Sequence, residues 1–114
     1  MNERKELGKI QNIRFGHGGY QDAMIGLSLI LGGDGWGVGT FISGFWDPNL
    51  IKHDEHCKWT ELQRTAAQAD LVIKISDLLR DAKVDDVMKL KNVPVECTFE
   101  GFELKDWRIL KEVL

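Results

Sequence analysis

The sequence has 114 residues, the size of one domain and too short for two, with 43% hydrophobic and 29% charged residues, a balance that excludes disorder as the main state. Its net charge of −3 argues against a protein whose main task is to neutralise the phosphates of DNA or RNA. The apolar stretches are far shorter than a membrane helix, the N-terminus shows no secretion signal, and the two cysteines fit a reducing compartment. We therefore expect a single cytoplasmic domain over residues 1–114, with neither a nucleic-acid polymer nor a membrane as its partner.

The first part of the chain is rich in glycine and nearly free of charge. Most of the 12 glycines lie within residues 16–44, and glycine at this density disfavours a helix. Apolar residues alternate with a period of two along Ile25–Leu31 and again along Trp36–Ile42, and Gly32–Gly35 supplies the positive-φ residues of a hairpin turn between them. With an earlier strand over Ile10–Phe15, this part is predicted to be a three-stranded antiparallel meander.

A long helix is predicted in the middle of the chain. Thr60 and Gln63 have the spacing of a capping box, and an apolar stripe with spacings of three and four residues continues to Ala82. Such a helix would be roughly 34 Å long, which equals or exceeds the diameter of a domain of this size. We therefore expect part of it to pack on a second subunit, so that the protein is at least a dimer. Asp85–Lys91 predicts a short second helical turn.

Two more strands are predicted at the end of the chain. Val93–Phe99 alternates cleanly, with Pro94 at the strand start, where a missing N–H is tolerated, and Phe102–Leu110 returns to the C-terminus. The expected fold class is α+β. It consists of an antiparallel sheet in the order strand–strand–strand–helix–strand–strand, with one long helix and a short second helix inserted between the strands.

A metal site is one candidate for chemistry. His53, His56 and Cys57 bring three possible ligands within five residues, which favours a zinc-binding module or a zinc-dependent enzyme. Zinc sites normally close with a second pair of ligands, which this spacing does not supply. The other interpretation is a polar connector before the helix.

Phosphate binding is a second candidate. The segments Gly16–Gly19 and Gly32–Gly37 would let backbone N–H groups approach an anion, but neither carries a Walker lysine, and hairpin geometry explains them as well. Tryptophans near strand ends, Trp46 among them, could form a stacking surface for a base. Arg108 lies on the opposite strand face from Trp107 and can bind a phosphate in a fork.

Several short segments resemble small phage proteins of the Thoeris anti-defence sponge family. They are Gly18–Met24, Gly35–Gly39, Lys58–Thr60, Val93–Glu96 and Leu104–Leu110. The resemblance covers most of the chain, from about residue 10 to residue 114.

The resemblance implies a protein that is not an enzyme and has no cofactor. It implies an oligomer built on dimers, with an antiparallel sheet and helices inserted between the strands. Proteins of that family sequester the cyclic ADP-ribose isomers that bacterial TIR-domain proteins make as immune signals, and some also hold cyclic oligonucleotides in separate sites. The expected partner is thus a small cyclic nucleotide, bound in the cytoplasm of the bacterial host.

The resemblance also suggests site residues. By position, Arg108 matches the family's C-terminal pocket arginine and Asn92 its asparagine, whereas Lys58 stands where the family has an arginine. The residues themselves add two features. The loop Gly18–Gln21 is expected to close over the ligand, and Trp46 is expected to provide a stacking surface. The candidate ligand-binding residues are therefore Arg108, Asn92, Gly19, Tyr20, Gln21, Trp46 and Lys58.

Overall fold

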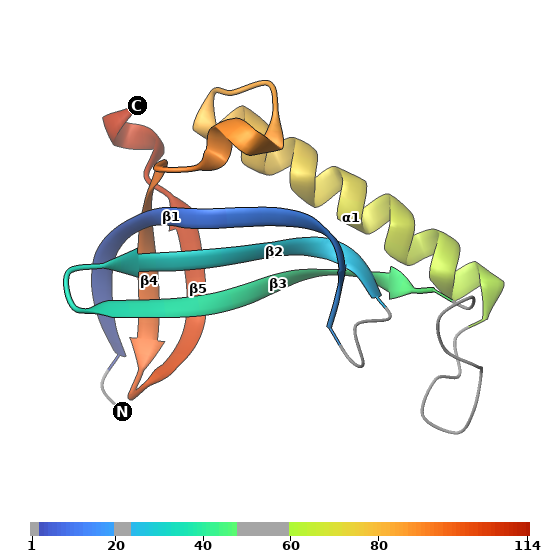
Figure 1. Cartoon of the computed structure of the whole chain (residues 1–114), viewed down its shortest axis with the longest axis horizontal. Helices are drawn as coiled ribbons and strands as arrows, with labels where there is room; N and C mark the ends of the chain where they lie inside the picture. The colour runs from blue at the N-terminus through green and yellow to red at the C-terminus, as the bar shows by residue number, and fades with distance from the viewer. Residues whose placement is uncertain (1–2, 20–23, 48–59) are drawn as a thin grey trace.

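The computed structural model of the chain describes residues 3–19, 24–47 and 60–114. It is an α+β fold in which a five-stranded antiparallel sheet curls around a core and one long helix packs alongside (Figure 1). The fold class and the order of the main elements are those predicted. The elements are β1 (Glu3–Gly18), β2 (Met24–Gly33), β3 (Trp36–Trp46), α1 (Glu61–Ala82), the 3-10 helix η2 (Val87–Leu90), β4 (Pro94–Glu100), β5 (Glu103–Ile109) and the 3-10 helix η3 (Lys111–Val113).

The central strand β1 belongs to both halves of the sheet, whose spatial order is β3-β2-β1-β4-β5. Its first part pairs with β4 from Glu3 to Lys9, and its second part pairs with β2 from Lys9 to Gly18. An irregularity in the register lies just beyond this change of partner, between Ile10 and Asn12. Figure 1 shows β1 bending from the direction of β4 and β5 into that of β2 and β3, so both halves contribute to one core.

The extent of β1 differs from the expectation. A strand was predicted over Ile10–Phe15, whereas β1 runs for 16 residues from Glu3 to Gly18. Glu3, Arg4 and Lys5 are all exposed, so this end of the strand has no buried face that a hydrophobic pattern could reveal. Its backbone pairing with β4, a strand some 90 residues away in sequence, holds it in the sheet instead.

The core is formed by the inward faces of the strands together with residues from the helical segments. On β2, Leu27, Leu29 and Leu31 are fully or almost fully buried, whereas Ile30 between them faces outward and is exposed, as the period of two predicts. The buried core residues are Ile10, Ile13, Leu27, Leu29, Leu31, Ala82, Leu90, Val93, Val95, Cys97, Phe99 and Ile109.

An aromatic contact joins the two halves of the sheet. The ring of Trp36, at the start of β3, meets Phe99 of β4 edge to face, with ring centroids 5.4 Å apart and an interplanar angle of 85°. The guanidinium of Arg4 lies 5.0 Å from the centroid of the same Phe99 ring. Both geometries are favourable for aromatic rings and add to the hydrophobic contribution of burying them.

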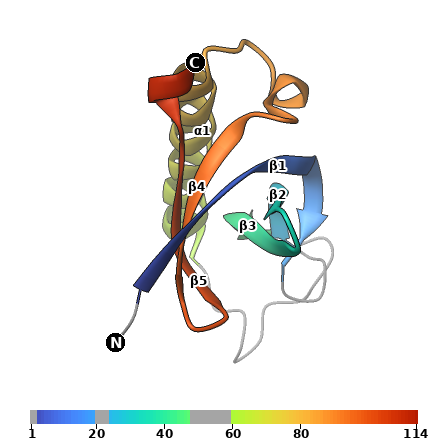
Figure 2. The ribbon, with the colours of Figure 1, turned by 90° about the vertical axis from the view of Figure 1, so that its left-hand side faces the viewer.

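The helix α1 begins with the predicted capping box. The Thr60 hydroxyl accepts a hydrogen bond from the Gln63 N–H at 3.1 Å, and the Gln63 side chain accepts one from the Thr60 N–H at 2.8 Å. The helix ends at Lys83, whose left-handed backbone (φ 60°) caps the last carbonyls. It packs mainly against β3 through a face that includes Leu71, and Figure 2 shows it running along one side of the curled sheet.

We predict that Gly8→Ala destabilises the fold, because a Cβ at this position would lie 2.4 Å from the carbonyl oxygen of Gly32, which is backbone and cannot move alone. Overpacking of this kind costs about 1–3 kcal/mol of the free energy of unfolding. The matched control is Gly37→Ala, whose added Cβ would meet nothing closer than 3.8 Å and should change stability by less than about 0.5 kcal/mol. Urea unfolding measures both, and equal stability of the two variants would contradict the close approach of β1.

Candidate functional site

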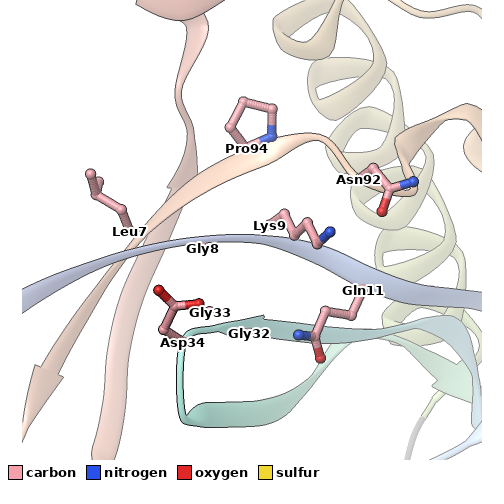
Figure 3. A pocket seen from close by; sticks show the side chains of 9 residues that line it. All are labelled: Leu7, Gly8, Lys9, Gln11, Gly32, Gly33, Asp34, Asn92 and Pro94. Atoms are coloured by element: carbon pink, nitrogen blue, oxygen red, sulfur yellow. The ribbon is translucent and has the colours of Figure 1, made fainter.

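A groove of about 520 Å³ crosses the sheet where β1 changes partner (Figure 3). It lies beside the point at which β1, the β2–β3 hairpin and the segment leading into β4 come together. The residues that line it are Leu7, Gly8, Lys9, Gln11, Gly32, Gly33, Asp34, Asn92 and Pro94. Its volume falls within the range of about 300–1,000 Å³ that small-molecule sites occupy.

Glycines line the groove because the strands approach one another closely there. A Cβ on Gly33 would lie 2.7 Å from the carbonyl oxygen of Leu7 and 2.7 Å from the indole nitrogen of Trp36. A Cβ on Gly32 would lie 2.6 Å from the side-chain amide of Gln11, so that amide rests directly against the backbone of β2. Without side chains of their own, these glycines leave the surface of the groove open to a ligand.

In the β2–β3 hairpin turn, one of the three glycines within Gly32–Gly35 has a positive φ. Gly35 has φ 76°, whereas Gly32 and Gly33 belong to β2, where Gly33 pairs with Trp36. The predicted hairpin turn is therefore confirmed, and of the glycines in Gly32–Gly35 it is Gly35 that supplies the positive φ. Gly32 and Gly33 allow the close approach of β1 and its neighbouring side chains instead.

Asn92, a predicted ligand residue, lines the groove. Its backbone is left-handed (φ 73°), a conformation that asparagine adopts more readily than most residues. The Asn92 N–H donates to the Ile10 carbonyl at 2.7 Å, and the Ile10 N–H donates to the Val93 carbonyl at 3.0 Å. These two bonds tie the segment before β4 to the bend of β1 and fix the position of the asparagine.

The polar side chains of the groove do not satisfy one another. Lys9, Gln11, Asp34 and Asn92 are exposed, and within the described part of the chain no side-chain hydrogen bond or ion pair engages any of them. Many charged residues elsewhere are paired, as Lys74 is with Asp70 and Lys89 with Asp85. The groove thus presents an ammonium, a carboxylate and two amides that are available to a ligand.

Arg108, the other residue matched by position, is held by two carboxylates on the outer face of β4 and β5. Its Nε donates to Glu96 at 3.1 Å, and its two terminal nitrogens donate to the two oxygens of Glu112 at 3.0 and 2.8 Å. Hydrogen bonding to Arg108 lowers the pKa of Glu112 from 4.5 to about 2, and the same bonds raise the pKa of Arg108. Because the pKa of Glu112 is lowered on folding, this pair stabilises the fold above about pH 4.5 and loses its effect as the pH falls toward 2.

Arg108 does not line the groove with Asn92. It faces Glu96 across β4 and β5, and Glu96 in turn faces Leu7 on β1, so Arg108 lies two strands from the edge of the groove on the same outward face. The predicted orientation, with Trp107 packed against the core and Arg108 on the other side of the strand, is confirmed.

Gly19 lies in a different hollow from Asn92. Its backbone has the positive φ (70°) expected of a glycine loop, and it follows the end of β1 farthest from β4. There it lines an open hollow of about 350 Å³ together with Arg14, Ser28 and Phe41. The structure therefore does not bring Gly19 and Asn92 into one pocket.

Several predicted residues cannot be placed. Tyr20, Gln21 and Lys58 lie outside the described residues, and so does the side chain of Trp46, whose backbone ends β3. The possible zinc ligands, His53, His56 and Cys57, also lie outside them. Among the residues that the structure does describe, no group of three or more His, Cys, Asp or Glu side chains could hold a metal ion.

The second cysteine is described, and its position makes it inert. Cys97 is completely buried in the core, and burial, followed by the charge of Glu96, raises the pKa of its thiol to about 11. At neutral pH such a thiol is protonated, so Cys97 lacks the thiolate that a reactive cysteine needs.

Three of the groove's polar residues were not among the predicted ligand residues. Lys9 and Gln11 belong to a stretch of the sequence that contains no recognisable binding motif. They line the groove because β1 bends at this point. Asp34 carried a signal, since it lies within Gly32–Gly37, one of the two glycine segments considered as phosphate cradles. That segment does line the groove through Gly32, Gly33 and Asp34.

The comparisons with known proteins leave the family open. No protein-family model, no curated protein and no solved structure matches this chain. Among the described residues, no helix is both long and apolar enough to cross a membrane.

Proposed function

We propose that this protein binds and sequesters a cyclic nucleotide immune signal, a cyclic ADP-ribose isomer made by TIR-domain proteins, without converting it. It would act as a phage protein in the cytoplasm of the bacterial host and thereby block anti-phage defence. The observation that carries the proposal is the groove at the bend of β1, which contains the predicted residue Asn92 and other donors that no described residue engages. The resemblance supplies the identity of the ligand.

The chemistry of the groove suits such a ligand. A cyclic ADP-ribose isomer carries a pyrophosphate with about two negative charges, two riboses and an adenine. The Lys9 ammonium can neutralise part of the phosphate charge, and the amides of Gln11 and Asn92 can donate to phosphate oxygens. A small ligand of this kind needs only a few well-placed donors, which agrees with a chain whose net charge is −3.

A role for Arg108 remains part of the proposal. To reach the ligand, its guanidinium would have to exchange its bonds to Glu96 and Glu112 for bonds or ring contacts with the ligand. The side chains of Arg108 and Glu112 are about half exposed, and an ion pair of this kind contributes little to stability, so breaking it costs little. The place of Arg108 opposite Glu96 and Leu7 would let it stack on the base of a ligand that extends past the Leu7 end of the groove.

We also propose that the protein is at least a dimer in which α1 forms part of the interface. The helix has a second apolar stripe on the side away from the core, with Leu62 and Ile73 exposed by 81% and 58% and with alanines between them. Residues 62, 66, 69 and 73 are spaced by four, three and four positions and so lie along one line of the helix. Their small and branched side chains suit a second copy of the same helix.

The function is tested by mixing the purified protein with a cyclic ADP-ribose isomer, removing free ligand and heating the complex. We expect the ligand to be retained and then released unaltered, as chromatography and mass spectrometry would show. Lys9→Ala and Asn92→Gly should each weaken binding by about tenfold or more, since each removes a hydrogen bond to a charged group, and glycine keeps the left-handed backbone at position 92. The control is Lys74→Ala, which removes a lysine of α1 that does not line the groove and should leave affinity unchanged.

A modified or consumed nucleotide would contradict sequestration, and no retained nucleotide would contradict binding. Calorimetry of Arg108→Ala decides the place of the arginine. A loss of about 10- to 150-fold corresponds to a charged hydrogen bond to the ligand, whereas less than about threefold in a folded variant puts Arg108 outside the site.

The dimer is tested by Ile73→Glu, which places a charge in the outer stripe of α1 without touching the core. Light scattering should give at least twice 13.0 kDa for the unaltered protein and a smaller particle for the variant. Gln68→Glu adds the same charge at an exposed position off the stripe and should not change the mass. A 13.0 kDa particle for the unaltered chain at micromolar concentration would contradict the proposal.

A further inference from the structure

The groove is electrically two-ended. Figure 3 shows the Asp34 carboxylate toward the Leu7 end of the groove, and Lys9, Gln11 and Asn92 farther along it, away from Leu7. All four side chains line the same groove, and no described residue forms an ion pair with Lys9 or Asp34. A ligand bound along the groove therefore meets an acceptor at one end and donors at the other.

The two ends select different chemical groups. An ionised carboxylate only accepts hydrogen bonds, and the neighbouring hydroxyls of a ribose are a neutral pair of donors that can reach both of its oxygens. The same carboxylate repels phosphate, because like charges at close range disfavour binding. The Lys9 ammonium at the other end only donates and attracts phosphate, and the amide NH2 groups of Gln11 and Asn92 beside it can donate to the same phosphate oxygens.

The position of Asp34 favours contact with a ligand over a purely structural role in the hairpin. Asp34 and Gly35 form the two-residue connection of the β2–β3 hairpin, and the positive φ of that connection is supplied by Gly35. The Asp34 side chain makes no hydrogen bond to any described residue, so it does not brace the turn. The bend of β1 against Gly33 brings the turn to the groove.

We infer that Asp34 is a specificity-determining residue that orients the ligand by accepting hydrogen bonds from ribose hydroxyls, with the phosphates held at the end of Lys9, Gln11 and Asn92. The inference rests on the proposed function, since it assigns the orientation of the nucleotide in the same groove. It also defines the class of ligand as a phosphate anion that carries a free sugar hydroxyl pair, and it excludes simple polyphosphates as preferred ligands.

The test compares the unaltered protein with Asp34→Asn, using calorimetry and two probes, a cyclic ADP-ribose isomer and inorganic pyrophosphate. Asparagine is as well accepted in turns as aspartate, so the hairpin is preserved. The variant should bind the isomer about tenfold more weakly, because it loses a charged acceptor. It should bind pyrophosphate as well as before or more tightly, because the repulsion is gone. Asp70→Asn, which removes one surface carboxylate from α1, is the control for net charge and should alter neither affinity by more than about twofold.

The outcomes separate this inference from the proposed function. If the unaltered protein binds the isomer and Asp34→Asn binds it equally well, the role of Asp34 is wrong and the function stands. Parallel changes for both probes, or no measurable binding of pyrophosphate by either form, would overturn the assigned polarity of the groove. If the unaltered protein does not bind the isomer at all, the function and the inference both fail.

Discussion

The close approach of β1 to the end of the β2–β3 hairpin is the constraint on which the rest of the structure depends. Gly8 and Gly33 have no room for a side chain there, because the neighbouring backbone and the Trp36 ring occupy the space. Before this contact β1 pairs with β4, and after it β1 pairs with β2, so one strand connects both halves of the sheet. The Trp36–Phe99 contact then closes the core between those halves.

The same constraint builds the candidate site. The groove lies where β1 bends against Gly32 and Gly33, which carry no side chains to fill it. The backbone hydrogen bond from Asn92 to Ile10 holds the segment before β4 beside this groove. Polar groups from three separate segments of the chain, Lys9, Asp34 and Asn92, reach this groove and find no partner among the described residues. The proposed binding role rests on this arrangement more than on any single motif.

The sequence predicted those parts of the fold that local chemistry determines. Thr60 and Gln63 gave the start of α1 because a capping box lies within four residues, and the alternation of Leu27, Leu29 and Leu31 gave the buried face of β2. The pairing of Glu3–Lys9 with β4 could not be predicted, because it joins distant segments and buries few of the strand's own side chains. Of the site, Asn92 was predicted, whereas Lys9, Gln11 and Asp34 come together only through the bend of β1.

The most direct test of the account is to map the backbone amide shifts of the isotope-labelled protein by NMR while a cyclic ADP-ribose isomer is added. If the ligand binds in the groove, the largest changes fall on the amides that line it, those of Gly8, Gly32, Gly33 and Asn92. Changes confined to the hollow around Gly18, Gly19 and Phe41, with the groove amides unmoved, would contradict it.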